Sequence, residues 1–473
     1  MPTRTKLVER SKDRTDIVNP YTGRSVGSVR LDRSADVTKA IATLKTYDHR
    51  LSPEARKTLL TQAADALERR RDEFAALITA ESGNCIKDSR KEVDRSLANL
   101  RLAAAEAVQL HGEALSVAVG GSRKIAMTVH EPVGVVCAIT PFNRPLNQVV
   151  VKVAPALAAN NAIIVKPSEK TPLTAIAFAE LLLENGCPEN MIAVVVGFPE
   201  EIGPVLTGSP LVDMITFTGS VETGERLARQ VGIKKIVLEL GGNDPLIVLG
   251  DADLDAAAKI AAEGALATAG QSCRGIKRLI VEEQIADAFV ARLLDQVRSR
   301  RCGDPSDTLT DIGTLIDEAA ARRVEARCAR ALKDGATLVH GGERRGALFQ
   351  PTVLDRVPPT TELVVAETFG PVAPVIRVRD DHEAIAVANG TRYGLQAGVA
   401  TRSFERFMAI ATRLRVGGVA LMDGPNFDSP QIPFGGVKAS GIGREGIRYT
   451  MREMSNVKTV LLPWAGPDGS VRV

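Results

Sequence analysis

The stretch VGVVCAITPFNRPLNQVVVKVAPALAANNAIIVKPSEK, residues 133–170, carries the pattern that decides the fold. A β-branched run leads into a segment rich in alanine and valine, and a second β-branched run follows it. The alternation continues with the apolar runs IAVVV (192–196), MITFT (214–218) and KIVLEL (235–240). Apolar strands separated by helices of this length predict βαβ units and a parallel, doubly wound sheet.

The same pattern restarts after the glycine pair 241–242. PLIVL, a helix over 254–269, RLIVE and a helix over 285–298 come first, and strands at APVIRV and GGVAL follow later in the chain. We therefore predict a second α/β unit, with its boundary near Gly241.

The segments outside the two units divide into helices and strands. Apolar residues at helical spacing predict one helix over 53–82 and another over 91–111, and the Ser-Pro pair at 52–53 supplies an N-cap and a first-turn proline. SRKIAMTVHEP (122–132) and NVKTVLLPW (456–464) are β-type segments without an obvious partner nearby. We expect them to pair away from both units, at a subunit interface.

Composition excludes several classes of protein. The chain has 473 residues, 44% hydrophobic and 25% charged, so it can bury sizeable cores and is neither disordered nor collagen-like. A formal net charge of +3 is too small to predict a nucleic-acid or membrane partner. The amino terminus is charged and has no apolar run, so we expect no secretory signal.

Six cysteines are spread along the chain without a CxxC pair. This spacing argues against a zinc site and against a disulfide framework. We therefore expect reduced thiols, a cytoplasmic protein and no bound metal.

Two residues are candidates for covalent and acid–base chemistry. Cys273 lies in the glycine-rich turn GQSCRG (270–275), where Arg274 can favour the thiolate, although a small core residue is the commoner fate of a single cysteine. Glu239 ends the strand KIVLEL. A carboxylate there lies either at a solvated edge or in a cavity that raises its pKa and suits it to act as a general base.

Three more motifs are candidates for ligand binding. Asn143 in ITPFNRPLN either donates its side-chain amide to a developing oxyanion or is a turn residue beside proline. Lys166 and Glu169 in VKPSEKTP either hold ribose hydroxyls or form a solvated pair. FTGSVETG (217–224) combines a strand, a turn and a helix, and offers N–H groups and a helix dipole to a phosphate, although it is not a GxGxxG motif.

These motifs, together with LELGGNDP (238–245), ETFGP (367–371) and PFGGVKASGIGREG (433–446), occur in an order and at separations that resemble the aldehyde dehydrogenase superfamily. The similarity runs from NPYTG (19–23) to the terminal strand. It implies an α/β aldehyde dehydrogenase fold with a Rossmann-type NAD-binding domain, a catalytic α/β domain and a small β oligomerisation flap. The implied bounds are, in that order, 1–117 with 133–241, then 242–450, then 118–132 with 451–473.

The resemblance also implies a role for each matching residue. Cys273 is similar to the nucleophile, Glu239 to the general base and Asn143 to the oxyanion donor of the family. The implied cofactor is NAD, because Glu169 should repel the 2′-phosphate of NADP. NADP remains the alternative. A homodimer or homotetramer is the implied assembly. The residues that the resemblance assigns to the cofactor are Lys166, Ser168, Glu169, Gly219, Ser220, Gly224, Glu367 and Phe369.

The implied reaction oxidises an aldehyde to a carboxylic acid through a thiohemiacetal and a thioester on Cys273. Glu239 would activate the water that hydrolyses the thioester, and its presence argues against the CoA-acylating branch of the family. The alternative from another class is a non-catalytic binding or structural protein. A scaffold would gain nothing from keeping Cys273, Glu239 and Asn143 together.

Three arginines bear on the identity of the aldehyde. Arg144 follows Asn143, Arg274 follows Cys273, and Arg101 falls on an otherwise apolar helix face. Each alone is more simply an ion-pair or surface residue. Together near one thiol they predict an anionic aldehyde, because guanidinium binds phosphonate and carboxylate bidentately.

Several stretches, among them LELGGNDPLIVLGDADLD and RRGALFQPTVLDRV, are similar to phosphonoacetaldehyde dehydrogenase-like members of the family. This similarity favours phosphonoacetaldehyde or phosphonoformaldehyde. The motif GQSCRG departs from that group, which tends to place the arginine before the cysteine. Succinate semialdehyde and sulfo-aldehydes are therefore the competing substrates.

Overall fold

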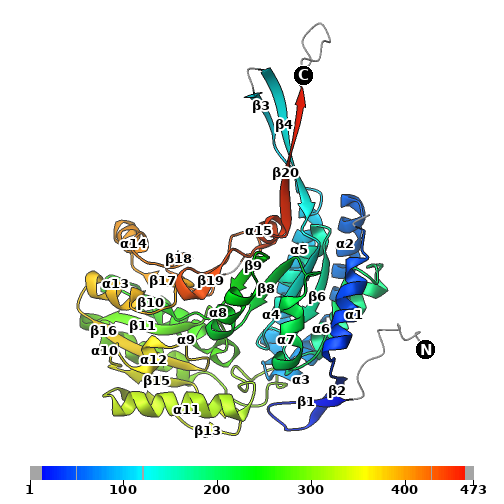
Figure 1. Ribbon diagram of the computed structural model, residues 1–473. Helices are drawn as coiled ribbons and strands as arrows, with labels where there is room; N and C mark the ends of the chain where they lie inside the picture. The colour runs from blue at the N-terminus through cyan, green and yellow to red at the C-terminus, as the bar shows by residue number, and fades with distance from the viewer. Residues whose placement is uncertain (1–12, 49–50, 120–121, 428, 464–473) are drawn as a thin grey trace.

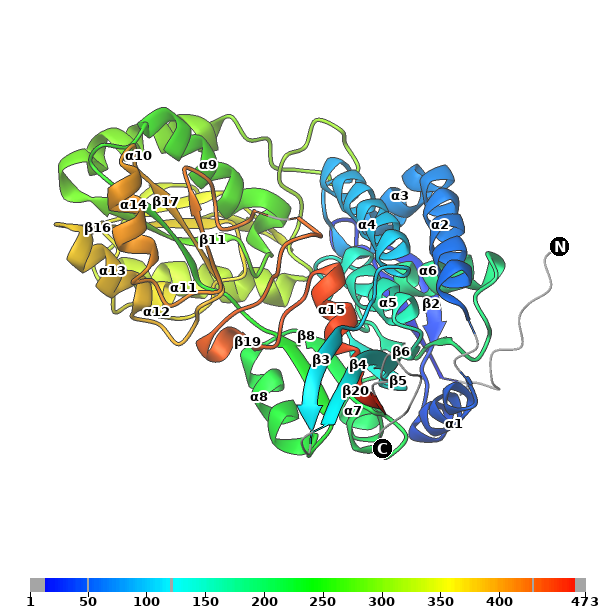
Figure 2. The same ribbon diagram turned by 90° about the horizontal axis from the view of Figure 1, so that it is seen from above.

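The computed structural model describes residues 13–48, 51–119, 122–427 and 429–463. Two α/β units lie side by side (Figures 1 and 2). A small three-stranded sheet projects away from the body on the side of the first unit (Figure 1). This arrangement confirms the predicted α/β fold.

The first unit contains a six-stranded sheet in the order β19-β9-β8-β5-β6-β7. Strands β5 to β9 are parallel, and each coincides with one of the five predicted runs. Apolar residues fill both faces of the central strands, as helices on both sides require. The bounds are β5 Val135–Ile139, β6 Ala162–Lys166, β7 Ile192–Val194, β8 Met214–Thr218, β9 Lys235–Glu239 and β19 Gly441–Ile442.

Helices cover the first sheet, and two predictions about them differ from the structure. The helix predicted over 91–111 is α4, which begins and ends five residues earlier. The segment 53–82 forms two helices that break at Arg70, not one. Leu67 and Phe74 are buried on either side of the break, so apolar spacing alone gave no sign of it. Ser52 caps the first of them as predicted, accepting a hydrogen bond from the Ala55 N–H at 3.1 Å. The bounds are α1 Ser34–Lys45, α2 Pro53–Arg69, α3 Arg71–Ser82, α4 Ile86–Glu106, α5 Asn147–Ala158, α6 Leu173–Glu184, α7 Pro199–Gly208, α8 Val221–Gln230 and α15 Ile447–Glu453.

The second unit contains a seven-stranded sheet in the order β12-β15-β16-β11-β10-β17-β18. All neighbours are parallel except β12 and β15. The predicted strands are β10, β11, β16 and β18. The sheet bounds are β10 Asp244–Val248, β11 Ile276–Glu282, β12 Thr337–His340, β15 Thr352–Asp355, β16 Val372–Val378, β17 Gln396–Ala400 and β18 Gly418–Leu421. The helices are α9 Leu254–Leu266, α10 Glu283–Arg298, α11 Glu318–Lys333, α12 Glu362–Val365, α13 Asp381–Asn389 and α14 Phe404–Ala411, with 3₁₀ turns η1 Ala267–Gly270 and η2 Lys438–Ser440.

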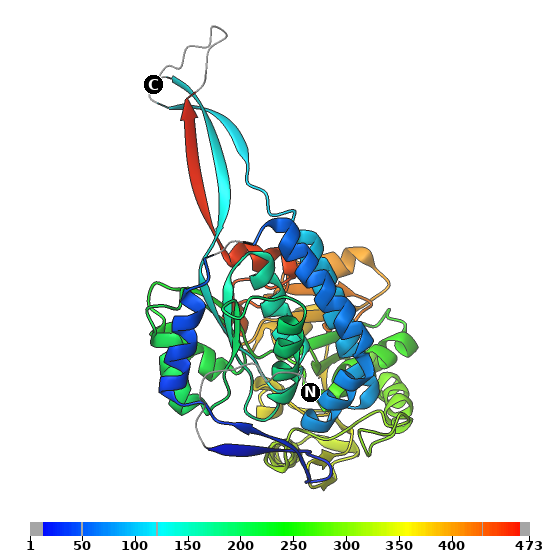
Figure 3. The ribbon, with the colours of Figure 1, turned by 90° about the vertical axis from the view of Figure 1, so that its right-hand side faces the viewer.

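The projecting sheet has the order β20-β4-β3, with β3 Ala114–Val119, β4 Ser122–Pro132 and β20 Ser455–Pro463. The two β-type segments of the sequence thus pair with each other, antiparallel from the pair Ser455 and Pro132 to the pair Pro463 and Lys124, and stand away from both units (Figure 3). The predicted start of this flap at 118 was late by four residues, since β3 begins at Ala114. Trp464 and the rest of the predicted segment 451–473 beyond it lie outside the described residues.

The predicted catalytic domain, 242–450, was wrong at its carboxyl end. Strand β19 pairs with β9 of the first sheet, and Ile447, Met451 and Met454 are part of the first unit's core. The chain therefore returns to the first unit after η2, and α15 lies next to α5 on the side of that unit that faces the second (Figure 2). Two short hairpins complete the fold: β1 Arg14–Val18 with β2 Ser25–Arg30, and β13 Arg344–Arg345 with β14 Leu348–Phe349.

Within the described ranges, the structure has no helix whose length and apolar character would let it cross a membrane.

Candidate active site

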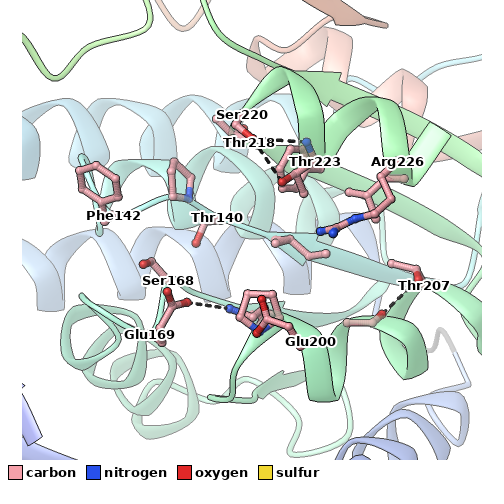
Figure 4. Close-up of a pocket in the computed structure, with 18 of the residues that line it drawn as sticks. Thr140, Phe142, Ser168, Glu169, Glu200, Thr207, Thr218, Ser220, Thr223 and Arg226 are labelled. Atoms are coloured by element: carbon pink, nitrogen blue, oxygen red, sulfur yellow. Dashed lines mark hydrogen bonds and ion pairs between the residues drawn. The ribbon is translucent and has the colours of Figure 1, made fainter. Parts of the chain in front are cut away.

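The loops after β5, β6 and β8 open at one edge of the first sheet, because these strands are adjacent and parallel. The chain reverses its direction across the sheet between β5 and β8, and open α/β sheets bind ligands at such a switch point. A cavity of about 610 Å³ lies there. Figure 4 shows side chains from all three loops around it. The polar residues that line it include Thr140, Lys166, Ser168, Glu169, Glu200, Thr218, Ser220, Thr223 and Arg226.

The amino end of α8 forms one wall of this cavity. The Ser220 hydroxyl caps the helix by accepting a hydrogen bond from the Thr223 N–H at 3.3 Å. A side chain at Gly219 would collide with Phe217, and one at Gly224 would collide with Leu240, so glycine lets the turn and the helix pack closely on the sheet. The N–H groups and dipole of this helix end suit an anion such as a pyrophosphate.

Lys166 and Glu169 lie together on the opposite wall. Lys166 is buried, and burial lowers the pKa of its ammonium. Its Nζ donates to the Pro167 carbonyl at 3.1 Å and to Glu169 Oε2 at 3.4 Å. An ammonium donor beside a carboxylate acceptor can hold the two hydroxyls of a ribose. The hydroxyls of Thr140 and Thr218 are buried without a hydrogen-bond partner among the described residues, so the cavity fits a polar dinucleotide.

A second cavity, of about 230 Å³, continues the first toward the second unit. Both are lined by Phe142, Thr218, Gly219 and Ser220. The smaller one is lined in addition by Asn143, Gln148, Leu240, Gly241, Cys273, Glu367 and Phe369. The sequence motifs from both units are thus brought together around one space, although 224 positions of chain separate the first of these residues from Glu367.

Two aromatic rings and one carboxyl shape the far end of this cavity. The rings of Phe142 and Phe369 meet edge to face, with centroids 6.0 Å apart. Glu367 accepts a hydrogen bond from the Gly242 N–H at 3.3 Å. Burial raises the pKa of Glu367 to about 7, against the opposing effect of the Lys277 ammonium. A planar ring and a ribose could be held between these groups.

Cys273 follows a strained turn at the end of α9. Thr268, Ala269 and Gly270 have φ angles of 53°, 53° and 71°, in the left-handed region that non-glycine residues rarely adopt. Two cations hold this turn. Arg144 Nη2 donates to Thr268 Oγ1 at 2.9 Å, and Lys277 Nζ donates to the Gly270 carbonyl at 2.5 Å.

Asn143 is held against the same turn. Its Nδ2 donates to the Gln271 carbonyl at 2.9 Å, and Asn84 Nδ2 donates to the Asn143 carbonyl at 3.0 Å. An amide nitrogen carries two hydrogens. The second hydrogen on Asn143 Nδ2 can therefore serve an oxyanion formed at Cys273, which lines the same cavity.

Arg274 favours the Cys273 thiolate, as predicted, but its effect is smaller than the opposing effect of burial. Burial of the sulfur raises the pKa of the Cys273 thiol to about 12. Arg274 lowers this pKa, but Glu367, Asp244 and Glu239 add to the effect of burial. The thiol must therefore give its proton to a base as it reacts.

Glu239 is the candidate for that base, and it lies close enough to Cys273 to raise the pKa of its thiol. It is buried at the end of β9, and neither of its carboxyl oxygens has a hydrogen-bond partner among the described residues. Burial, and then the nearby Glu445 carboxylate, raise its pKa well above the ordinary value, against Lys152, Arg444 and Arg274. An unpartnered carboxyl with a raised pKa is suited to proton transfer.

Lys152 and Glu445 are functional candidates that the sequence analysis missed. Lys152 is fully buried on α5, forms an ion pair with Glu445, and donates to Thr216 Oγ1 at 3.1 Å. The only signal was a lysine inside the apolar run 149–159, since a charge there needs a buried partner. Glu445 lies within the quoted motif PFGGVKASGIGREG.

A third cavity, of about 60 Å³, lies on the other side of Cys273. Arg274 lines it. Its Nη1 donates to the Phe427 carbonyl at 3.1 Å, and its guanidinium lies 5.3 Å from the centroid of the Phe434 ring. The remaining polar residues of its lining are Asn99, Asn147, Gln148, Ser429 and Glu445.

The three predicted arginines do not converge. Arg101 has a side chain 52% exposed and forms an ion pair with Glu68 at 2.7 Å. It lies at the edge of the buried stripe of α4, so no anion is needed to compensate its charge. Arg144 holds Thr268 and does not line any of the three cavities. Arg274 alone of the three lines a cavity together with Cys273.

Comparison with known proteins identifies the family to which this chain belongs. Residues 7–460 match the family model described as the aldehyde dehydrogenase family. The chain belongs to the aldehyde dehydrogenase family. It is 38% identical over 458 residues to a lactaldehyde dehydrogenase of Methanococcus maripaludis, covering 95% of this chain and 97% of that protein.

Two further similarities bear on the substrate and the cofactor. The dehydrogenase is 38% identical to a 3-sulfolactaldehyde dehydrogenase of Priestia aryabhattai, covering 96% of each chain. It superposes with a TM-score of 0.92 on a glyceraldehyde-3-phosphate dehydrogenase of Methanocaldococcus jannaschii complexed with NADP. That pair is 36% identical and covers 96% of this chain and all of the other. The protein is thus an NAD(P)-dependent aldehyde dehydrogenase.

Proposed function

We propose that this dehydrogenase oxidises a small anionic aldehyde to its carboxylic acid at Cys273, with NAD as cofactor. The observation that carries the proposal is the position of Arg274. Arg274 lines a cavity of about 60 Å³ together with Cys273. A fixed cation in so small a space favours a short aldehyde with an anionic group, because guanidinium pairs strongly with oxyanions.

The cofactor would occupy the two larger cavities. Lys166 and Glu169 would hold the adenosine ribose, the α8 end with Ser220 the pyrophosphate, and Glu367 with Phe369 the nicotinamide end. Glu169 disfavours a 2′-phosphate and supports NAD over NADP. When bound, the oxidised nicotinamide supplies the hydride acceptor, which leaves the acyl group on Cys273 as a thioester.

The first chemical step is the attack of Cys273 on the aldehyde. Glu239, directly or through water, takes the thiol proton, and the sulfur forms a bond to the carbonyl carbon. The carbonyl oxygen gains the negative charge. The second hydrogen on Asn143 Nδ2 and the Cys273 backbone N–H donate to this oxyanion and stabilise it.

Hydrolysis of the thioester completes the reaction. Glu239 removes a proton from a water molecule whose oxygen bonds to the acyl carbon, and the carbon–sulfur bond then breaks. The acid leaves and Cys273 regains a proton. The intact Glu239 supports this non-acylating course over transfer of the acyl group to CoA. Between the two steps Glu239 must release the thiol proton, so that its carboxylate can accept a proton from the water. The Lys152–Glu445 pair lies near enough to affect the pKa of Glu239.

The nature of the anion is part of the proposal. A phosphonoaldehyde, phosphonoacetaldehyde or phosphonoformaldehyde, is our first choice from the sequence motifs. A sulfo-aldehyde and succinate semialdehyde are the competitors, and the similarity to a 3-sulfolactaldehyde dehydrogenase supports the sulfonate. The same guanidinium can bind all three types of anion.

The test is a panel of aldehydes assayed for NADH and NADPH formation. The panel contains phosphonoacetaldehyde, sulfoacetaldehyde, succinate semialdehyde and acetaldehyde. We expect a higher kcat/KM for an anionic aldehyde than for acetaldehyde, NAD preferred to NADP, and no activity in Cys273→Ala. Equal efficiency on neutral and anionic aldehydes would refute the proposed specificity, and full activity of Cys273→Ala would refute the mechanism.

We also propose a homo-oligomer built on the projecting sheet and a location in the cytoplasm. Strands β3 and β20 expose apolar residues such as Leu115, Val119, Val457 and Leu461, which a second subunit would cover. All six cysteines are free thiols, as a reducing compartment would leave them. Light scattering should give a mass near two or four times 50.4 kDa.

A further inference from the structure

Cys273 and Gln148 are the two described residues that line both cavities on either side of the nucleophile. Gln148 lies in the first turn of α5, and its backbone N–H donates to the Arg144 carbonyl at 3.0 Å. Gln148 thus lies at the junction where the cofactor side meets the substrate side. Because Cys273 and Gln148 line the same two cavities, an aldehyde bound at the Cys273 sulfur can bring a substituent near its carbonyl to this amide.

The side-chain oxygen of Gln148 is an acceptor without a donor. Gln148 Oε1 is buried and has no hydrogen-bond partner within the described ranges. A buried acceptor left unpaired destabilises a protein. The side-chain oxygen of the neighbouring Asn147 on the substrate side is paired, because it accepts a hydrogen bond from Asn99 Nδ2 at 2.9 Å. The unpaired oxygen thus marks the place where a donor from the substrate would be bound.

The charges around the amide select the kind of donor. The Arg274 guanidinium lines the same small cavity and disfavours an ammonium group on the substrate. The carboxylate that also lines it, Glu445, is already paired with Lys152. A neutral hydroxyl is the donor that fits, since it can give its hydrogen to Oε1 without adding charge.

We propose that Gln148 is a specificity-determining residue that binds a hydroxyl on the carbon next to the aldehyde carbonyl. The natural substrate is then an anionic 2-hydroxyaldehyde, and the product is a 2-hydroxy acid. The phosphonoaldehydes, the sulfo-aldehyde and succinate semialdehyde named above are then analogues that carry the anionic group but lack the hydroxyl. The inference rests on the proposed oxidation at Cys273 and adds the hydroxyl to the anionic group read by Arg274. An aldehyde without that hydroxyl leaves Oε1 unpaired in the complex and reacts less efficiently.

The test compares two matched pairs of aldehydes that differ by one hydroxyl. The neutral pair is 2-hydroxypropanal and propanal, and the anionic pair is 2-hydroxy-3-sulfopropanal and 3-sulfopropanal. For the wild-type enzyme we expect kcat/KM to favour the hydroxylated member of a pair by about tenfold or more, the value of one hydrogen bond to a buried acceptor. This measurement needs no variant and does not depend on the folding of one.

Gln148→Met keeps the length of the side chain and removes the amide. We expect it to bring the ratio within a pair close to one, through a lower kcat/KM for the hydroxylated aldehyde and little change for the other. The matched control is Gln296→Met. Gln296 lies on α10 and lines none of the three cavities, so this variant should keep the wild-type ratio.

The outcomes separate this inference from the proposed function. If aldehydes are oxidised but neither pair shows a preference for the hydroxyl, or if Gln148→Met keeps the full preference, the inference about Gln148 is overturned and oxidation at Cys273 stands. If no aldehyde in either pair or in the earlier panel yields NADH or NADPH, the proposed function itself fails. A hydroxyl preference lost in Gln148→Met supports the inference in either pair.

Discussion

The two sides of Cys273 are built differently. On the cofactor side, cavities of about 610 and 230 Å³ are lined by residues at the carboxyl ends of β5, β6 and β8. On the substrate side, a cavity of about 60 Å³ is lined by residues of α4 and α5 and by the loops before α15. The first side follows from the topology of a parallel sheet, whereas the second depends on how particular helix faces and loops pack.

The two sides also differ in how their charges are arranged. On the cofactor side, the buried Lys166 pairs with Glu169, whose side chain is 27% exposed. On the substrate side, Glu239, Glu445 and Lys152 are buried together, with Arg274 close enough to lower the pKa of Glu239. Buried charges are costly unless they are paired, so the groups on the substrate side depend on one another. Substitutions of the buried charged residues on the substrate side should therefore change both the activity and the stability of the protein, more than substitutions on the cofactor side.

The largest effect is expected at the buried ion pair. Lys152→Met leaves the Glu445 carboxylate buried without its partner, and we expect a loss of about 3–5 kcal/mol in the free energy of unfolding. Urea unfolding measures it. Lys170→Met is the matched control, because Lys170 forms a partly exposed pair with Asp317 whose loss should cost about 1 kcal/mol or less. Equal losses of stability in the two variants would show that burial does not make the Lys152–Glu445 pair more important to folding than a partly exposed pair.

A smaller effect is expected on the pH profile. The Glu445 carboxylate contributes to the raised pKa of Glu239, after burial. Glu445→Gln removes that negative charge, so ionisation of Glu239 becomes easier and its pKa falls. The base form is then present at lower pH, and the acid limb of kcat/KM against pH should move to lower pH. A limb that stays in place, or that moves to higher pH, would show that Glu445 does not act on Glu239. Glu405→Gln, on the exposed face of α14, should leave the profile unchanged.

Most of the fold could be predicted from the sequence because its signals are local. Each strand from β5 to β9 is a continuous apolar run, and the residues that follow the strands are placed by the sheet itself. Asn143, Lys166 and Gly219 are therefore found on the cofactor side without knowledge of tertiary packing. The break at Arg70 was missed because buried residues continue across it on the same face.

The substrate side could not be predicted in the same way, because its contacts join distant parts of the chain. Lys152 meets Glu445 across 293 positions, which no local pattern reveals. Arg101 shares its helical spacing with apolar residues, yet it lies at the edge of the stripe and binds Glu68. Arg144 was expected at the substrate and instead supports the left-handed turn at Thr268.

The central claim is that Arg274, beside Cys273, makes the enzyme selective for anionic aldehydes. Its most direct test is the ratio of kcat/KM for phosphonoacetaldehyde to that for acetaldehyde in Arg274→Met, with Arg101→Met as the matched control. Loss of one charge-assisted contact should lower the ratio by roughly ten- to 150-fold, equivalent to about 1.5–3 kcal/mol. Arg101→Met should keep the wild-type ratio, because its guanidinium is bound to Glu68 at the surface. A ratio in Arg274→Met equal to that of the wild type would contradict the claim.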